Sequence, residues 1–136
     1  MKKLLLAVPV LALLAAPAMS GEKLELTEKQ QTKLDKRLEG RVAGKPKSCI
    51  NYQDQKSMTV ISDDVLIFGA RRNASTIYVN KPHGGCRNAD RNVLTYRRSI
   101  SSLCRGEIVR VIDNLTGTFQ GSCSFGEFVP YTKKAS

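Results

Sequence analysis

Catalytic motifs are missing from this 136-residue sequence, and histidine occurs only once, as His83. There is no glycine-rich phosphate-binding loop, no H-E-x-x-H zinc motif and no G-x-S-x-G nucleophile elbow. The sequence also lacks internal repeats, low-complexity segments and the strand–helix alternation of a dinucleotide-binding domain. Because no motif supports an enzyme, we expect a non-enzymatic protein without catalytic residues, a bound metal or a cofactor.

The cysteines lack the close C-x-x-C spacing that metal sites commonly use. Cys49, Cys86, Cys104 and Cys123 are separated by 37, 18 and 19 residues. An even number of widely spaced cysteines in a small exported chain indicates disulfides rather than a metal site. Four cysteines allow three pairings, and the spacing does not select one of them.

Long apolar runs are confined to the beginning of the chain. Two lysines precede the apolar residues 4–14, and small residues surround the bond between Ser20 and Gly21. This layout is typical of a secretory signal peptide, and the apolar run is too short for a stable membrane span. We expect a signal peptide over residues 1–20, cleaved near Ser20/Gly21, and a periplasmic or secreted mature chain without a transmembrane segment.

Residues 21–47 differ from the rest of the mature chain in having many charges and no aromatic side chain. Thr27 and Gln30 have the spacing of a capping box, which marks the beginning of a helix. Apolar residues then recur at four-residue intervals, at Leu34, Leu38 and Val42. We predict a charged helical arm and linker, with a helix over about residues 28–39 and a loop after it. The apolar stripe favours a helix that covers one side of the main domain, over a free partner-binding arm.

From residue 48 onward, short segments rich in β-branched and aromatic residues alternate with turn formers. The segments are 57–61, 64–71, 75–80, 92–98, 106–113 and 126–131. This rhythm predicts an antiparallel β domain over residues 48–133, with roughly five to seven strands. A small, partly closed barrel-like sheet is favoured over a two-sheet sandwich, because closure removes exposed strand edges. The predicted fold is therefore mainly β and disulfide-stapled, with one short N-terminal α-helix.

The segment KPHGGCRNADR, residues 81–91, places His83 three residues before Cys86. A Cys–His catalytic pair needs a free thiolate beside the imidazole, and such sites are usually assembled from separate segments. A disulfide at Cys86 removes that thiol, so a glycine-rich β-connection is the favoured interpretation. The adjacent acids Asp63 and Asp64 also indicate a turn, since neighbouring strand residues point to opposite faces.

Basic residues dominate the charge of the mature chain. Cleavage of the signal removes two lysines and no acids, so 20 basic and 12 acidic residues remain and the formal net charge falls from +10 to +8. Basic residues crowd the β domain, and Lys81 and Arg110 belong to this group. The candidate anion-binding residues are Arg71, Arg72, Arg87, Arg91, Arg97, Arg98 and Arg105.

Two interpretations of this basic surface stay open, because spacing does not show whether the arginines converge. If they share a face with Tyr78 and Tyr96 exposed, they suit an anionic envelope polymer or protein, while nucleic acid is not expected as the partner of an exported chain. If they are spread out, they form a solvated surface. A further hypothesis is a structural or inhibitory module that binds another envelope protein through a sheet edge or through residues 22–47.

Three blocks of the sequence resemble a family of small secreted proteins of unknown function from sphingomonad-type and related alphaproteobacteria. The blocks are LEGRVAGKPKSCI (38–50), SSLCRGEIVRVID (101–113) and GEFVPYTK (126–133). The resemblance runs from about residue 34 to 133 and implies an exported protein, without implying an activity. Its relatives tend to keep the cysteines matching Cys49 and Cys104, and many lack those matching Cys86 and Cys123. The resemblance therefore implies the pairs Cys49–Cys104 and Cys86–Cys123.

Overall fold

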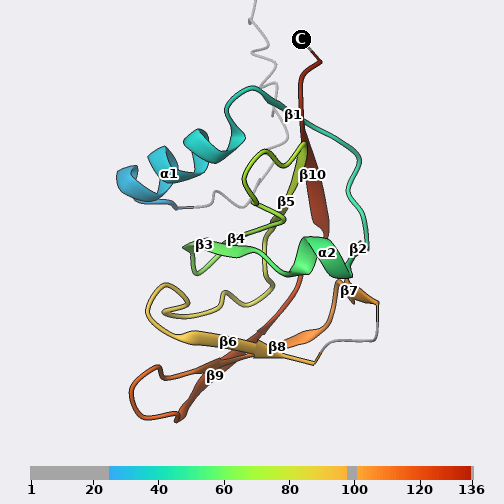
Figure 1. Ribbon diagram of the computed structural model, residues 1–136. Coiled ribbons are helices and arrows are strands. Elements are labelled where there is room, and N and C mark those ends of the chain that lie inside the picture. Colours follow the sequence, from blue (N-terminus) through green and yellow to red (C-terminus); the bar gives the residue numbers. More distant parts are fainter. Residues whose placement is uncertain (1–24, 98–100, 136) are drawn as a thin grey trace, which may run out of the picture.

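The structure is a computed structural model that describes residues 25–97 and 101–135 (Figure 1). The expected signal peptide and its cleavage site lie outside the described residues, as does the candidate Arg98. The described residues contain ten strands and two helices. Within those ranges, no helix is long and apolar enough to cross a membrane.

The largest sheet has five antiparallel strands in the order β1-β10-β5-β4-β3. Its strands are β1 (Arg41–Ala43), β3 (Met58–Ser62), β4 (Val65–Phe68), β5 (Thr76–Asn80) and β10 (Phe128–Lys133). The residues of β1 were expected to form a loop. They instead pair with β10, and the Arg41 guanidinium fastens them by donating to the carbonyl oxygens of Ala74 at 2.8 Å, Ser75 at 2.9 Å and Tyr131 at 3.3 Å.

Two smaller antiparallel sheets complete the β structure. β2 (Cys49–Asn51) pairs with β7 (Ser102–Cys104), and β6 (Val93–Tyr96), β8 (Ile108–Ile112) and β9 (Phe119–Ser124) form a three-stranded sheet in the order β6-β8-β9. A second helix, α2 (Tyr52–Gln55), follows β2 and was not predicted. The mainly β, antiparallel fold is confirmed. The sheets do not close on themselves, so "barrel-like" describes them only loosely.

The N-terminal helix α1 (Glu28–Leu38) covers one face of the five-stranded sheet. Its predicted capping box is present: the Thr27 amide donates to the Gln30 side chain at 2.9 Å, and the Gln30 amide donates to the Thr27 hydroxyl at 3.3 Å. Leu34 and Leu38 pack against buried residues of the sheet, which are Ile61, Val65, Ile67, Ile77 and Val79. Lys33 Nζ donates to the Val60 carbonyl oxygen at 2.7 Å and so ties the helix to edge strand β3. The helix therefore covers the domain, as its apolar stripe predicted.

The opposite face of the five-stranded sheet packs against the two smaller sheets. Phe68 of this sheet contacts Phe125 and Phe128 edge to face, with ring centroids 5.6 Å apart in both cases. Ile50 and Leu103 bring β2 and β7 into the same core, and buried residues of β8 and β9 complete it. The five-stranded sheet therefore lies between the helix and the smaller sheets, and both of its faces are buried (Figure 1).

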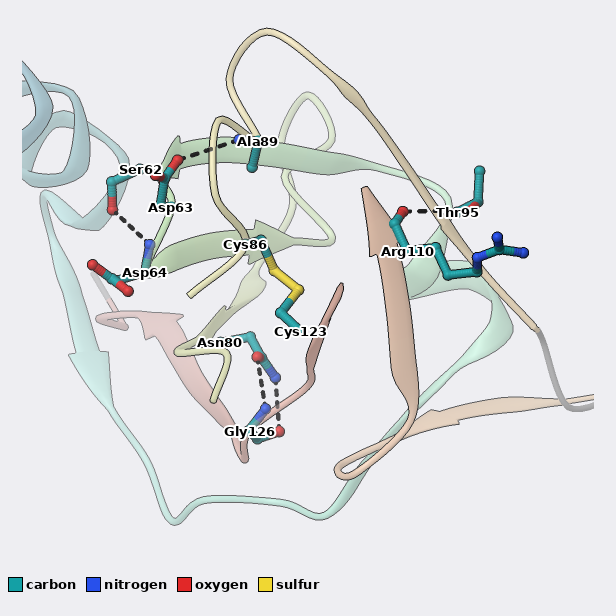
Figure 2. Close-up of a disulfide and its surroundings, with 10 residues drawn as sticks. All are labelled: Ser62, Asp63, Asp64, Asn80, Cys86, Ala89, Thr95, Arg110, Cys123 and Gly126. Atoms are coloured by element: carbon teal, nitrogen blue, oxygen red, sulfur yellow. Dashed lines mark hydrogen bonds between the residues drawn. A yellow bond between two sulfur atoms is a disulfide. The ribbon is translucent and has the colours of Figure 1, made fainter. Parts of the chain in front are cut away.

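Two disulfides join the elements of this core. Cys49–Cys104 links directly opposed positions of β2 and β7. Cys86–Cys123 links the connection after β5, residues 81–92, to strand β9 (Figure 2). These are the two pairs that the family resemblance implied. The presence of disulfides indicates an oxidising compartment outside the cytoplasm.

Candidate functional site

Cys86 is not available as a nucleophile, because its sulfur is bonded to Cys123. Cys86 is fully buried, whereas His83 is exposed. The backbone of His83 pairs with Ser124 in both directions, at 2.9 and 3.3 Å, so this histidine continues the sheet beside β9. The preference for a β-connection over a Cys–His reaction centre is confirmed.

The turn between β3 and β4 holds this connection in place. The backbone carbonyl oxygen of Asp63 accepts a hydrogen bond from the Cys86 amide at 2.7 Å. The side-chain carboxylate of Asp63 accepts one from the Ala89 amide at 3.2 Å (Figure 2). Asp64 Oδ1 approaches Gly85 so closely that a side chain there would meet it at 2.9 Å. The predicted Asp63–Asp64 turn therefore also has a tertiary role, which its sequence did not reveal.

A buried asparagine fastens the other side of the connection. Asn80 is fully buried, and its amide nitrogen donates to the carbonyl oxygens of Gly126 at 2.8 Å and Glu127 at 3.3 Å. Its side-chain oxygen accepts from the Gly126 amide at 3.0 Å (Figure 2). Gly126 has no room for a side chain, because a Cβ there would collide with the Lys81 carbonyl oxygen. Asn80 thus connects the end of β5 to the bend between β9 and β10.

The candidate arginines lie in separate groups. The start of β5 pairs with the end of β10, and the end of β5 pairs with the start of β10. Arg71 and Arg72, in the turn before β5, therefore lie at one end of the five-stranded sheet. Arg87 and Arg91, in the connection after β5, lie beyond its other end.

Three candidate arginines have acidic neighbours. Arg71 is 3.5 Å from Asp54, Arg91 is 3.8 Å from Asp90 and Arg105 is 3.0 Å from Glu127. Exposed ion pairs of this kind stabilise a fold by about 1 kcal/mol or less, so they have little structural weight. They do lower the net positive charge that these three arginines present to a ligand.

Arg97, by contrast, lies in a groove that also contains Arg110 from the adjacent strand. The groove has a volume of about 530 Å³ and is lined by Thr95, Tyr96, Arg97, Glu107, Ile108 and Arg110. Thr95 and Arg110 are directly opposed in β6 and β8, and the Thr95 hydroxyl donates to the Arg110 carbonyl oxygen at 3.5 Å. Figure 2 shows both side chains on the side of β8 away from the Cys86–Cys123 bridge.

The charge of this groove is positive. Neither Arg97 nor Arg110 forms an ion pair with another described residue. Glu107 is the acidic residue of the lining, and its Oε1 accepts a hydrogen bond from the Cys104 amide at 3.0 Å while its Oε2 is buried. Two guanidinium groups and one carboxylate line the groove, so it favours an anion.

The groove overlaps a larger surface that we call the outer face, the solvent side of the β6-β8-β9 sheet, and Arg97 adjoins this face as the residue after β6. Strand alternation turns Val109, Val111 and Cys123 into the core and leaves the residues between them outside. The outer face consists of Val93, Thr95, Ile108, Arg110, Ile112, Phe119, Ser122 and Ser124. Arg110 lies over the Phe119 ring, with its guanidinium carbon 5.3 Å from the ring centroid. The single charge within the apolar segment IVRVI is the sequence signal that points to Arg110.

Tyr78 does not lie on an exposed basic surface, since it is buried against the core. Burial raises the pKa of its hydroxyl, and the negative charge of Asp54 together with a hydrogen bond to that residue raises the pKa further. Tyr96 is half-buried and packs edge to face on Phe125, with the ring centroids 5.2 Å apart. The condition that both tyrosines are exposed beside the arginines is therefore not met by Tyr78.

Comparison with known proteins does not assign a family. No protein-family model, curated protein or solved structure matches the chain. Among residues 25–97 and 101–135, no group of three or more histidine, cysteine or acidic side chains is placed to hold a metal ion.

Proposed function

We propose that this protein is a non-enzymatic binding module of the bacterial cell envelope, exported through its N-terminal signal peptide and belonging to the secreted alphaproteobacterial family that it resembles. Its partner is anionic and binds at the groove between β6 and β8. The observation that carries the proposal is that Arg97 and Arg110 line the same groove. Neither forms an ion pair with an acidic side chain among the described residues. The two disulfides support the location, because such bonds persist in oxidising compartments.

The groove suits a phosphate, sulfate or carboxylate group. A guanidinium group offers a planar set of N–H donors that fits such oxyanions better than an ammonium group does. Arg97 follows β6 directly and Arg110 lies in the neighbouring strand β8, and Thr95 adds a neutral polar group to the lining. Ile108 supplies part of the apolar lining, which suits contact with the uncharged portion of a larger ligand.

Retention on immobilised heparin over a salt gradient tests the proposal. We expect the Arg97→Gln/Arg110→Gln variant to elute at clearly lower salt than the wild type, because attraction between exposed charges is screened by salt. The matched control is Arg72→Gln/Lys134→Gln, which also removes two positive charges but at the end of the five-stranded sheet away from the groove. Equal losses in the two variants would show that net charge alone governs binding, and would contradict a specific groove.

A further inference from the structure

The outer face combines exposed apolar side chains with positive charge. Ile108 is 61 % exposed, Phe119 56 % and Val93 46 %, and these side chains come from three neighbouring strands. Val93 pairs with Ile112, and Ile112 pairs with Phe119, so Val93, Ile112 and Phe119 form one apolar row across the sheet. Ile108 lies at the other end of β8, opposite Ser124. None of the eight outer-face positions is acidic. Large exposed apolar groups mark an interaction site. Arg110 is the one charged residue among the eight positions, while Glu107 of the adjoining groove accepts a hydrogen bond from the Cys104 amide.

Leu115 is an exposed apolar residue beyond the end of this sheet. It lies in the turn between β8 and β9 and is 93 % exposed. Asp113 Oδ1 accepts hydrogen bonds from the amides of Leu115 and Thr116, both at 2.8 Å, and the Asp113 amide donates to the Thr118 carbonyl oxygen at 2.8 Å. These bonds order the turn before any partner is present, so little conformational entropy is lost when the leucine is buried.

We infer that the outer face and Leu115 bind the surface of an anionic lipid bilayer, with Arg97 and Arg110 at the headgroups and the apolar side chains inserted below them. This inference rests on the proposed function and names its partner. A bilayer offers anionic groups and an apolar interior at adjacent depths, which matches the composition of this face. The Arg110 guanidinium lies over the Phe119 ring, so positive charge and apolar surface are adjacent on this face.

Charge also argues against a second copy of the chain as the occupant. A symmetric dimer brings the same patch of both subunits together. Arg110 lies in the central strand of the sheet, with Thr95 on one side and Ser122 on the other. Two outer faces in contact would therefore bring two Arg110 guanidinium groups into one interface, and none of the eight outer-face positions supplies a carboxylate to compensate them. Lipid phosphates supply the missing negative charge.

Co-sedimentation with lipid vesicles tests this inference on the folded, disulfide-bonded mature chain. We expect binding to vesicles that contain phosphatidylglycerol and no binding to vesicles of phosphatidylcholine alone. Leu115→Ser lowers the partition constant about tenfold through lost apolar burial. Each of Arg97→Gln and Arg110→Gln lowers it about fivefold through lost attraction to the headgroups. The control variant Val42→Ser, at a 51 % exposed position of β1, binds like the wild type.

The outcomes separate this inference from the proposed function. If Leu115→Ser binds anionic vesicles as well as the wild type does, lipid insertion is excluded. If vesicles are not bound but heparin retention still depends on Arg97 and Arg110, the bilayer is the wrong partner and the anionic groove remains. If neither vesicles nor heparin are bound, both proposals fail. A dimer in vesicle-free solution that Leu115→Ser disrupts would assign the face to a second copy and overturn the inference.

Discussion

Asn80 is a position at which a single side chain should have a large effect on the stability of the fold. Replacement by alanine removes a fully buried amide and leaves the Gly126 amide and carbonyl groups without that partner. A buried backbone group without a hydrogen bond costs about 1–3 kcal/mol. We therefore expect Asn80→Ala to lower the free energy of unfolding by about 2–5 kcal/mol, measured by urea denaturation at neutral pH.

The variant Asn80→Asp distinguishes the contribution of the hydrogen bonds to stability from the contribution of side-chain volume. Its carboxylate still accepts from the Gly126 amide, but it faces the Gly126 and Glu127 carbonyl oxygens, to which the native amide donates. Burial favours the protonated carboxyl and raises its pKa, so the aspartate variant should be very unstable at pH 7 and regain stability as the pH falls through that raised pKa. An alanine variant within about 0.5 kcal/mol of the wild type would refute this account, as would an aspartate variant that is fully stable at pH 7.

Two further predictions concern the core. The double substitution Cys86→Ala/Cys123→Ala should lower the free energy of unfolding by about 4 kcal/mol, from a sequence separation of 37 residues, and a loss below about 1 kcal/mol would contradict the loop-entropy estimate. Tyr78 has a pKa above the usual 10.0, so the stability that its neutral form provides is complete below about pH 10 and is lost as the pH rises through the raised pKa. Alkaline urea titrations should therefore show a steeper loss in the wild type than in Tyr78→Phe, and equal slopes would exclude this role.

The helix and the apolar strands could be predicted from local patterns. Thr27 and Gln30 marked the first turn of α1, and the leucine stripe correctly placed that helix against the sheet. The apolar segments at β4, β5 and β8 were also recognisable, because both faces of β4 and much of β5 are buried. Local sequence was sufficient wherever burial is continuous or alternating along the strand, or periodic along the helix.

The remaining elements depend on contacts between residues far apart in the chain. β2 and β7 are three-residue strands, and their pairing accompanies the Cys49–Cys104 bond. β9, with the sequence FQGSCS, has few β-branched residues and forms a strand because it pairs with β8. The groove was missed for the same reason: Arg97 and Arg110 line one groove only because β6 pairs with β8 in this register. Strand register is a property of the assembled sheet, and spacing along one chain does not reveal it.

Amide chemical-shift mapping with a short sulfated oligosaccharide tests the central claim most directly. The titration locates the binding surface residue by residue on the intact, oxidised protein. We predict salt-sensitive shifts concentrated at Thr95, Arg97, Ile108 and Arg110, and unchanged resonances in the turn from Gly69 to Ser75. Shifts centred on that turn, at Arg71 and Arg72, would contradict the assignment of the anionic site to the groove between β6 and β8.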